Sequence, residues 1–545
     1  MVMKEENGAS SNNKQRKEQS MFSKNTKMEL VQTVMELSEL PVVEGSEVKK
    51  SETVTEWDVK EGTYTSTIDP ATGDIVYAPI TKVSKHENLK MFDIKLAISS
   101  SYDHMVTASE DHSLITLNPM TLELEKTRPE DSKGRCVPMT RHNKGNSARE
   151  NGQGICTELH FPSGTYQMSY EMGLFLGLMV GDGWVSRLET SPIIQIACCE
   201  PSLQERIKEL SKSANMPFTK EASFGSYEAD EQRFSKDNMQ RLTFFMDQDD
   251  KRYINDLIGH GAENKRIPYP SFMSSRTHML GVLMGLLATD GVVSHRPPTG
   301  SKKSPCKSIA YHTISPVLRD GVQELAHRLG VKTSVTDYIG STSGNQTYMV
   351  NFCLEDMVRL YDSNKARFVV PVSYKQEAME RIAKDFHENM KADCTKTWTS
   401  YDIVPFPKGL FCEFSWADIV KLDKNVVISA RSKGFIKRCV AKRIADALER
   451  RDWSIYKDPT YLKQSDRSGH TPSEALALVN KWIAMVRNDD IGWEVVEDVT
   501  PSTCTEGWDC TVPGPYTFSL STGTVVQDTV NIHVPVSKKA VQDVR

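Results

Sequence analysis

The stretches FLGLMVGDG (175–183) and LMGLLATDG (283–291) decide the fold of this chain. Each is an apolar, helix-like segment with a glycine near its middle, and each ends in Asp-Gly before a valine-rich stretch. Downstream of both copies, the pattern of apolar residues predicts strands followed by an amphipathic helix. The unit of helix, strands and helix is therefore present twice, which predicts a pseudo-twofold domain.

The chemistry of the repeat follows from its glycines and acids. A glycine inside a helix costs about 1 kcal/mol relative to alanine, a cost that is explained if the two helices approach closely at Gly177 and Gly285. Each helix then ends in an acid, Asp182 or Asp290, where the helix dipole disfavours negative charge. Two such acids brought together repel each other unless divalent cations lie between them. The pattern therefore predicts a phosphodiesterase site in which Asp182 and Asp290 hold Mg²⁺.

Both nonapeptides resemble the signature of the LAGLIDADG homing endonucleases, with Asp182 and Asp290 at the positions of the metal-binding acids. NKRIPYPSF (264–272) and YHTISPVLRDGVQELAHRLG (311–330) resemble two further blocks of this family, and the matching residues are Lys265, Ile267, Pro268, Thr313, Ser315, Leu318, Leu325 and Gly330. The resemblance implies a pseudo-twofold αββαββα fold over residues 165–395. It also implies a Mg²⁺-dependent enzyme that cuts both strands of a long DNA site and reads it with two saddle-shaped sheets in the major groove. Lys302 and Lys303 are candidates for active-site or phosphate-contacting lysines, with solvated surface as the favoured alternative.

Strand-like sequence flanks this repeat on both sides. β-branched runs broken by turn residues begin at about Thr53 and return from Ile491 to Thr529. The two halves of such an all-β region would have to pair across the helical insertion. The flanks resemble the Hint fold of inteins, which predicts an α+β multidomain chain: Hint parts at 53–150 and 491–528, interrupted by the endonuclease.

The Hint resemblance implies residues for protein splicing, which requires nucleophilic and acid–base steps. Ser109-Glu110-Asp111-His112 resembles the Thr-x-x-His block, and Asp509 matches the acid that helps to activate the nucleophile. Asp528 takes the place of the last intein residue and Thr529 that of the downstream nucleophile. Gln527, Asp528 and Tyr516 stand where the family usually has His, Asn and His, so slow or altered C-terminal cleavage is expected.

The two ends of the sequence suggest partners. TVNIHVPVSKKAVQDVR (529–545) resembles a segment of the RNA polymerase beta-prime subunit through His533, Val534 and Pro535, which implies a polymerase-like C-extein. No upstream junction block precedes Thr53. We therefore expect a separate N-terminal intein fragment that associates with this chain and splices in trans. Residues 1–52 are interpreted as a polar leader in which 28–40 forms a docking helix, with Leu30, Val34, Leu37 and Leu40 on one face.

A mixed segment at 396–490 holds a predicted basic helix over 430–452. Its cations could contact phosphate or lie on a solvated face, and they are Arg431, Lys433, Lys437, Arg438, Lys442, Arg443, Arg450 and Arg451. Residues 130–165 are predicted to form a polar linker, because Gly, Asn, Ser, Lys and Arg dominate there.

Composition limits the class of protein. With 38% hydrophobic and 26% charged residues, the chain has the profile of a globular protein. No apolar run of about 18 residues predicts a membrane span, and no signal peptide opens the chain, so a cytoplasmic location is expected. The eleven cysteines lack CxxC spacing, and most should be free thiols. A net charge of −5 requires any DNA-binding face to be local.

Three alternatives remain open at this stage. The chain could be a free-standing homing endonuclease whose Hint flanks no longer splice, which the missing upstream block and the Asp528 ending support. It could be a DNA-binding regulator with the LAGLIDADG fold and no enzymatic activity. Loss of one acid would indicate such a regulator, but both Asp182 and Asp290 are present. It could also be a fragment of an RNA polymerase, which few residues support.

Overall fold

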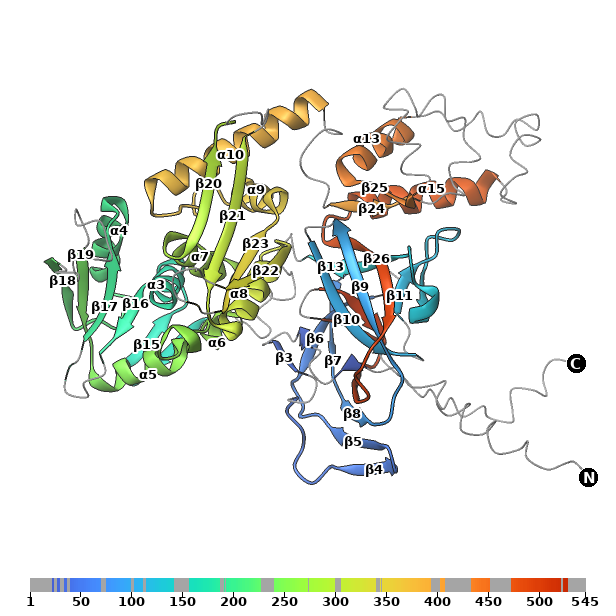
Figure 1. Cartoon of the computed structure of the whole chain (residues 1–545), viewed down its shortest axis with the longest axis horizontal. Coiled ribbons are helices and arrows are strands. Elements are labelled where there is room, and N and C mark those ends of the chain that lie inside the picture. The colour runs from blue at the N-terminus through green and yellow to red at the C-terminus, as the bar shows by residue number, and fades with distance from the viewer. Residues whose placement is uncertain are drawn as a thin grey trace, which may run out of the picture.

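The computed structural model describes residues 22–23, 27–29, 34–36, 40–69, 75–99, 102–110, 114–141, 156–186, 191, 193–226, 240–272, 274–298, 305–339, 344, 346–393, 402–406, 433–450, 472–520 and 523–527. The molecule is mixed α/β and has three parts: a helix–sheet part with an internal repeat, a β-rich part, and a smaller part made mainly of two helices (Figure 1). Among the described residues, no helix is both long and apolar enough to cross a membrane.

The internal repeat predicted from the sequence is present in the helix–sheet part. The first copy consists of α3 (Tyr170–Gly181), β16 (Gly183–Val185), β17 (Ile193–Cys198), α4 (Pro201–Ser211), β18 (Lys220–Ser226), β19 (Gln240–Phe245) and α5 (Gln248–Ile258). The second consists of α7 (Arg276–Ala288), β20 (Gly291–Arg296), β21 (Cys306–Thr313), α8 (Pro316–Arg328), β22 (Thr333–Ile339), β23 (Gln346–Phe352) and α9 (Leu354–Ser363). The sheets have equivalent strand orders, β16-β17-β19-β18 and β20-β21-β23-β22.

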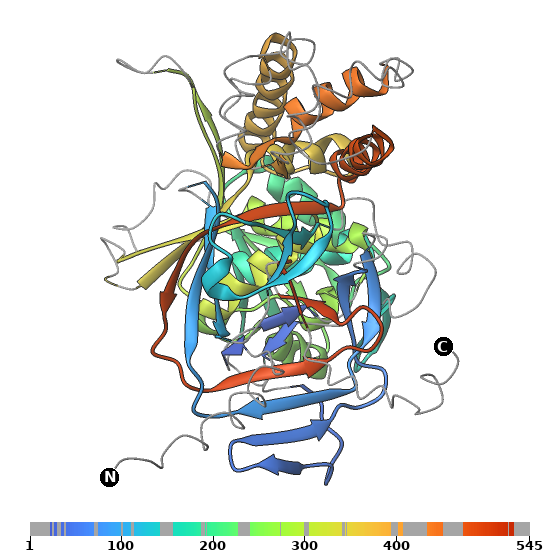
Figure 2. The same cartoon turned by 90° about the vertical axis from the view of Figure 1, so that its right-hand side faces the viewer.

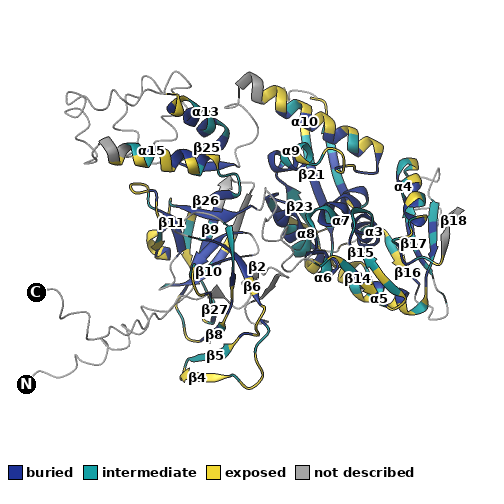
Figure 3. Cartoon of the chain, turned by 180° about the vertical axis from the view of Figure 1, so that it is seen from behind, coloured by how far each residue is buried: buried dark blue, intermediate teal, exposed yellow. Residues whose placement is uncertain are grey.

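Helices α3 and α7 form the centre of this part and lie between the two sheets (Figure 3). Ser169 and Ser275 cap their N-termini by accepting hydrogen bonds from the backbone N–H groups of Met172 and His278. Nearly all of their residues are buried, which suits helices that are covered on every side. A final helix, α10 (Ser373–Asp393), packs against β20.

Strands from both ends of the chain build the β-rich part. Its largest sheet has the order β13-β26-β9-β10-β1-β27-β8-β5-β4. Five of these strands are β13 (Cys136–Thr140), β10 (Tyr102–Ser109), β1 (Phe22–Ser23), β5 (Val54–Asp58) and β4 (Val48–Ser51). The late strands β26 (Ile491–Pro501) and β27 (Gly507–Thr511) pair with the early strands β9 (Met91–Ser99) and β8 (Lys82–His86). Figure 2 shows these blue and red segments running side by side. The pairing across the helical insertion that the sequence analysis required is therefore present.

The N-terminal predictions were wrong in two respects. Instead of a helix over 28–40, β2 (Lys27–Glu29) and β3 (Val34–Glu36) pair as an antiparallel hairpin, and β2 contacts the β-rich part. The β-rich part also begins before Thr53, because Leu40 is buried in its core and β4 (Val48–Ser51) pairs with β5 (Val54–Asp58). Tertiary pairing has overridden the local helical periodicity here.

The polar linker predicted over 130–165 also needs correction. β13 (Cys136–Thr140) is fully buried and pairs with β26, and β14 (Glu158–Phe161) and β15 (Gly164–Gln167) form a hairpin. Because the partner of β13 lies hundreds of residues later in the sequence, its local composition did not reveal the strand.

The third part contains β24 (Ile403–Pro405), β25 (Phe435–Lys437), α13 (Arg438–Glu449) and α15 (Pro472–Arg487). Apolar residues of α13 and α15, such as Ile444 and Trp482, share a core with Leu117 and Trp493 of the β-rich part. A buried carboxylate, Asp402, ties all three parts together through guanidinium groups, and its partners are Arg141, Arg359 and Arg438.

Candidate active site

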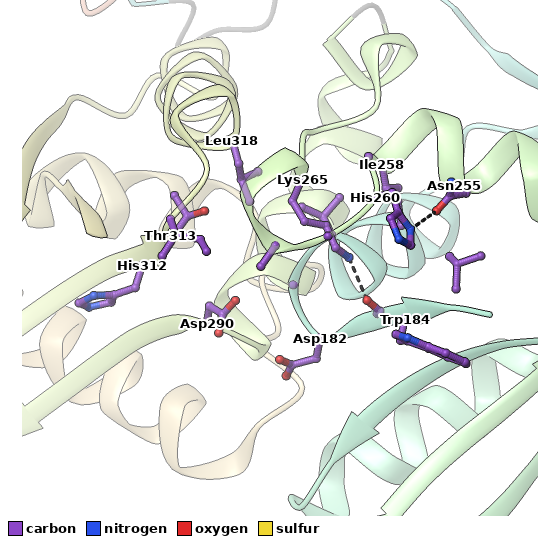
Figure 4. Close-up of a pocket in the computed structure, with 18 of the residues that line it drawn as sticks. Asp182, Trp184, Asn255, Ile258, His260, Lys265, Asp290, His312, Thr313 and Leu318 are labelled. Atoms are coloured by element: carbon purple, nitrogen blue, oxygen red, sulfur yellow. Dashed lines mark hydrogen bonds between the residues drawn. The ribbon is translucent and has the colours of Figure 1, made fainter. Parts of the chain in front are cut away.

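The two acids of the repeat follow the ends of the two central helices. Asp182 is the C-cap of α3, and Asp290 follows Thr289, the C-cap of α7. The helices touch through their glycines: a Cβ on Gly177 would lie 2.3 Å from the carbonyl oxygen of Val282, and one on Gly285 would lie 2.5 Å from that of Leu174. The close approach predicted from the glycines is therefore observed. It brings the two acids to the same place from the two halves of the repeat (Figure 4).

Both acids line a single cavity with a volume of about 470 Å³. Lys265, His260, His312 and Trp184 also line this cavity. In Figure 4, the carboxyl groups of Asp182 and Asp290 lie next to each other at the centre of this site.

The electrostatics of the acids reflect this crowding. Burial, and then the charge of Asp290, raise the pKa of Asp182 to about 7. Burial also raises the pKa of Asp290, while Lys375, His312 and Lys265 act in the opposite direction. A cation bound between these two buried carboxyl groups would stabilise them, because a nearby positive charge favours their charged forms.

Each helix end that carries an acid also holds a buried lysine. The Lys265 ammonium donates to the backbone oxygens of Met179 and of Gly183, the latter at 2.9 Å. The Lys375 ammonium donates to those of Leu287, Ala288 and Thr289 at 2.9–3.0 Å. Burial lowers the pKa of Lys265 to about 8, while the two acids act to raise it. Carbonyl oxygens at helix C-termini attract cations, so the fold itself holds two positive charges beside the acids.

Lys375 was missed by sequence reasoning. It lies in α10, outside the repeated motif, and nothing in its neighbourhood marks it. One signal was available: Lys375 follows Lys265 by nearly the same number of residues as Asp290 follows Asp182. Of the other residues matched by the resemblance, Ser315 caps α8, and its hydroxyl donates a hydrogen bond to the backbone oxygen of Lys265 at 2.7 Å. Ser315 therefore helps to hold the backbone of Lys265 in place.

The donor set fits a divalent cation. Carboxylate oxygens are the ligands that Mg²⁺ and Ca²⁺ prefer, and Mg²⁺ usually keeps several waters and shares phosphate oxygens with its substrate. The described residues hold no cluster of three or more His, Cys, Asp or Glu side chains. Asp182 and Asp290 would therefore leave most of the coordination positions to water and to a bound phosphate.

A second group of predicted residues lies in the β-rich part. Ser109, at the end of β10 (Tyr102–Ser109), and Asp509 in β27 are only 2% and 1% exposed. Phe22 of β1 (Phe22–Ser23) pairs with both Ala108 and Trp508. β1 therefore lies in a slot between β10 and β27. Ser109 and Asp509, each one residue beyond these partners of Phe22, face each other across the next position of this slot. Predicted residues that lie outside the described part of the chain are His112, Asp528, Thr529, His533, Val534, Pro535, Lys302 and Lys303.

The predicted basic helix contains cations that are paired with acids of the fold. Arg438 is fully buried and donates to Asp402 at 3.0 Å and to backbone oxygens that include that of Asn488 at 2.8 Å. Lys442 binds Asp489 at 2.8 Å. Both are structural, which argues against reading the helix as a single phosphate-binding face. Arg431 and Arg451 lie outside the described residues.

Comparison with known proteins gives one family match, over residues 277–369, to the LAGLIDADG-like domain. No curated protein matches the chain. Among solved structures, mesophilic variants of the homing endonuclease I-DmoI are similar at 14% identity over 36% of this chain and 95% of that one, with a TM-score of 0.24. The homing endonuclease I-WcaI bound to its DNA recognition sequence is similar at 12% identity over 38% of this chain and 85% of that one, with a TM-score of 0.29. An intein from a hyperthermophile is similar at 16% identity over 22% of this chain and 73% of that one, with a TM-score of 0.19.

Proposed function

We propose that the helix–sheet part, residues 156–393, is a metal-dependent endonuclease that cuts both strands of duplex DNA. The observation that carries the proposal is the doubled arrangement: two acids that line one cavity, and one buried lysine at each of the two helix ends that carry them. A duplex offers two antiparallel backbones, and a pseudo-twofold site can present equivalent groups to each of them. The family match over 277–369, which includes Asp290, supports the same proposal.

Asp182 and Asp290 would hold the divalent cations, which we propose to be Mg²⁺. A bound metal of this kind supplies a water molecule with a lowered pKa and neutralises charge on the phosphate. Lys265 and Lys375 stabilise the charged forms of the two acids and add positive charge where the scissile phosphates enter. The helix contact at the glycines keeps the two acids at a constant separation.

The test begins with a target. A plasmid library with a randomised insert, together with a plasmid that encodes TVNIHVPVS without interruption, is incubated with the protein and Mg²⁺, and the linearised plasmid is recovered. Asp182→Asn and Asp290→Asn should each abolish linearisation of that plasmid, because an amide is a weak ligand for Mg²⁺. Asp249→Asn is the matched control, since its side chain is 70% exposed on α5. Cutting by the double variant at the wild-type rate, or in the presence of EDTA, would refute the proposal.

A second proposal concerns the β-rich part, which we propose to be a protein-splicing domain. The observation in its favour is that Ser109 and Asp509, from opposite ends of the chain, flank one slot position between β10 and β27. In this proposal, an extended strand from a separate upstream fragment takes the place of β1 in this slot and pairs with β10 and β27. Such a strand would carry the Cys, Ser or Thr that attacks its own preceding carbonyl.

In this proposal, His112 and Asp509 act on the incoming nucleophile, Thr529 accepts the acyl group, and Asp528 releases the product. The residues after Thr529 would belong to an RNA polymerase-like host. Co-expression with the upstream gene product should give a peptide ligated directly to TVNIHVPVS, detected by mass spectrometry. Thr529→Ala is the control that should abolish ligation. If the wild-type chain is never joined to other sequence while it still cuts DNA, only the endonuclease proposal stands.

A further inference from the structure

The two halves of the endonuclease site are equivalent in most of their parts. Asp182 corresponds to Asp290, and each precedes a glycine that begins a strand, Gly183 or Gly291. The register of the next strand gives the further equivalences, because Gly183 pairs with Ile196 and Gly291 pairs with Tyr311. The residue after each partner is therefore also equivalent, which matches Ala197 with His312.

This last pair breaks the symmetry of the site. Ala197 presents a methyl group, whereas His312 presents an imidazole that lines the cavity with both acids. Their neighbours Ile196 and Tyr311 are buried on the core side of the two sheets, so Ala197 and His312 lie on the opposite face. Figure 4 shows His312 on the Asp290 side of the cavity, while the Asp182 side has Trp184.

The imidazole of His312 is held in a defined orientation. Its Nδ1 is hydrogen-bonded to the Tyr338 hydroxyl at 3.1 Å, and the two rings meet edge to face with centroids 6.4 Å apart. The backbone N–H of His312 lies 3.4 Å from the carbonyl oxygen of Asp290, which ties the histidine to the acid's own segment. Among the described residues, Nε2 has no hydrogen-bond partner. A fixed ring with one open nitrogen in a polar cavity is suited to hold a water molecule.

We propose that His312 assists the hydrolysis of only one of the two DNA strands, the strand whose scissile phosphate lies beside Asp290. This inference rests on the proposed endonuclease function. His312 is a positioning residue here: Nε2 holds the attacking water by a hydrogen bond. The water oxygen forms a bond to phosphorus, and the bond from phosphorus to the leaving sugar oxygen breaks. Solvent takes one proton from the water and gives one to the sugar oxygen, so the imidazole ends as it began.

The asymmetry makes a specific prediction for the His312→Ala variant. Loss of one positioning hydrogen bond should slow cleavage of the Asp290-side strand roughly tenfold, while the other strand is cut at the wild-type rate. On the supercoiled plasmid recovered with the wild-type protein and Mg²⁺, nicked circles should then accumulate before linear product forms. End-labelled duplex should show that the slow strand is always the same one.

Two variants distinguish positioning from a merely structural role. His312→Gln keeps a side-chain donor and acceptor in reach, and it should restore most of the lost rate. His312→Ala combined with Ala197→His moves the imidazole to the Asp182 half, and it should reverse which strand is cut first. If His312→Ala cuts both strands with the wild-type ratio, or if His312→Gln nicks as His312→Ala does, the inference is overturned. If the wild-type protein cuts no plasmid at all, the proposed function itself has failed.

Discussion

Substitution of Gly177 by alanine links the packing of the helix–sheet part to its chemistry. A Cβ at this position would meet the Val282 carbonyl oxygen at 2.3 Å and the Gly285 Cα at 3.0 Å. Both obstacles are backbone atoms, which cannot rotate away. An ordinary contact needs about 1 Å more, so α3 and α7 have to separate or tilt by an amount of this order.

The free energy of unfolding should fall, although by less than the clash alone suggests. Overpacking of this kind costs typically 1–3 kcal/mol, while alanine regains about 1 kcal/mol of helix propensity. The expected net loss is therefore about 0–2 kcal/mol. Activity should suffer more, because Asp182 lies at the end of the same helix and a misplacement of about 1 Å can cost 10²-fold in rate.

The chain offers a matched control for this experiment. Gly321 lies inside α8, where a Cβ would meet only the side chains of Ile267 and Phe272 at 3.6 Å, an ordinary contact. Gly321→Ala should keep full activity and raise the stability by up to about 1 kcal/mol. The measurements are urea unfolding and the rate of linearisation of the recovered plasmid. If Gly177→Ala cuts at the rate of Gly321→Ala, the glycine contact does not set the separation of the acids.

Three further predictions concern buried ionisable groups. Lys375→Met should reduce plasmid cutting by about a hundredfold while DNA binding in a gel-shift assay is retained; equal loss of binding would contradict the proposed role. Asp402→Asn should lower the stability by about 3–5 kcal/mol, because it leaves buried guanidinium groups uncompensated, whereas Asp489→Asn, with its side chain 38% exposed, should cost much less in the same urea titration. Burial lowers the pKa of His278 to about 4 from an ordinary value of 6.5. The contribution of neutral His278 to the free energy of unfolding is therefore full above pH 6.5 and is lost as the pH falls toward 4, by up to about 3 kcal/mol. His278→Gln should flatten this part of the pH profile of urea unfolding, and an unchanged profile would contradict the assignment.

Local patterns in the sequence were sufficient for the repeated unit and its acids. The apolar helix with a central glycine and a final Asp-Gly occurs twice, so the repeat, the close helix contact and the meeting of Asp182 with Asp290 could all be predicted. These features depend on residues that are close together in the sequence, and their period identifies the element that carries them.

The remaining features were decided by tertiary structure, because each depends on residues far apart in the sequence. β13 became a strand because β26 pairs with it. Residues 27–29 and 34–36 pair as two strands, the first of which contacts the β-rich part, instead of forming the helix that their periodicity favoured. Arg438 belonged to a basic run in the sequence, yet the fold buries it against Asp402. Lys375 reaches the end of α7 only because α10 packs beside it, and the contrast between His312 and Ala197 emerges only from strand register. Local periodicity carries no information about which distant backbone or charge will satisfy a given residue, so only the assembled fold decides these contacts.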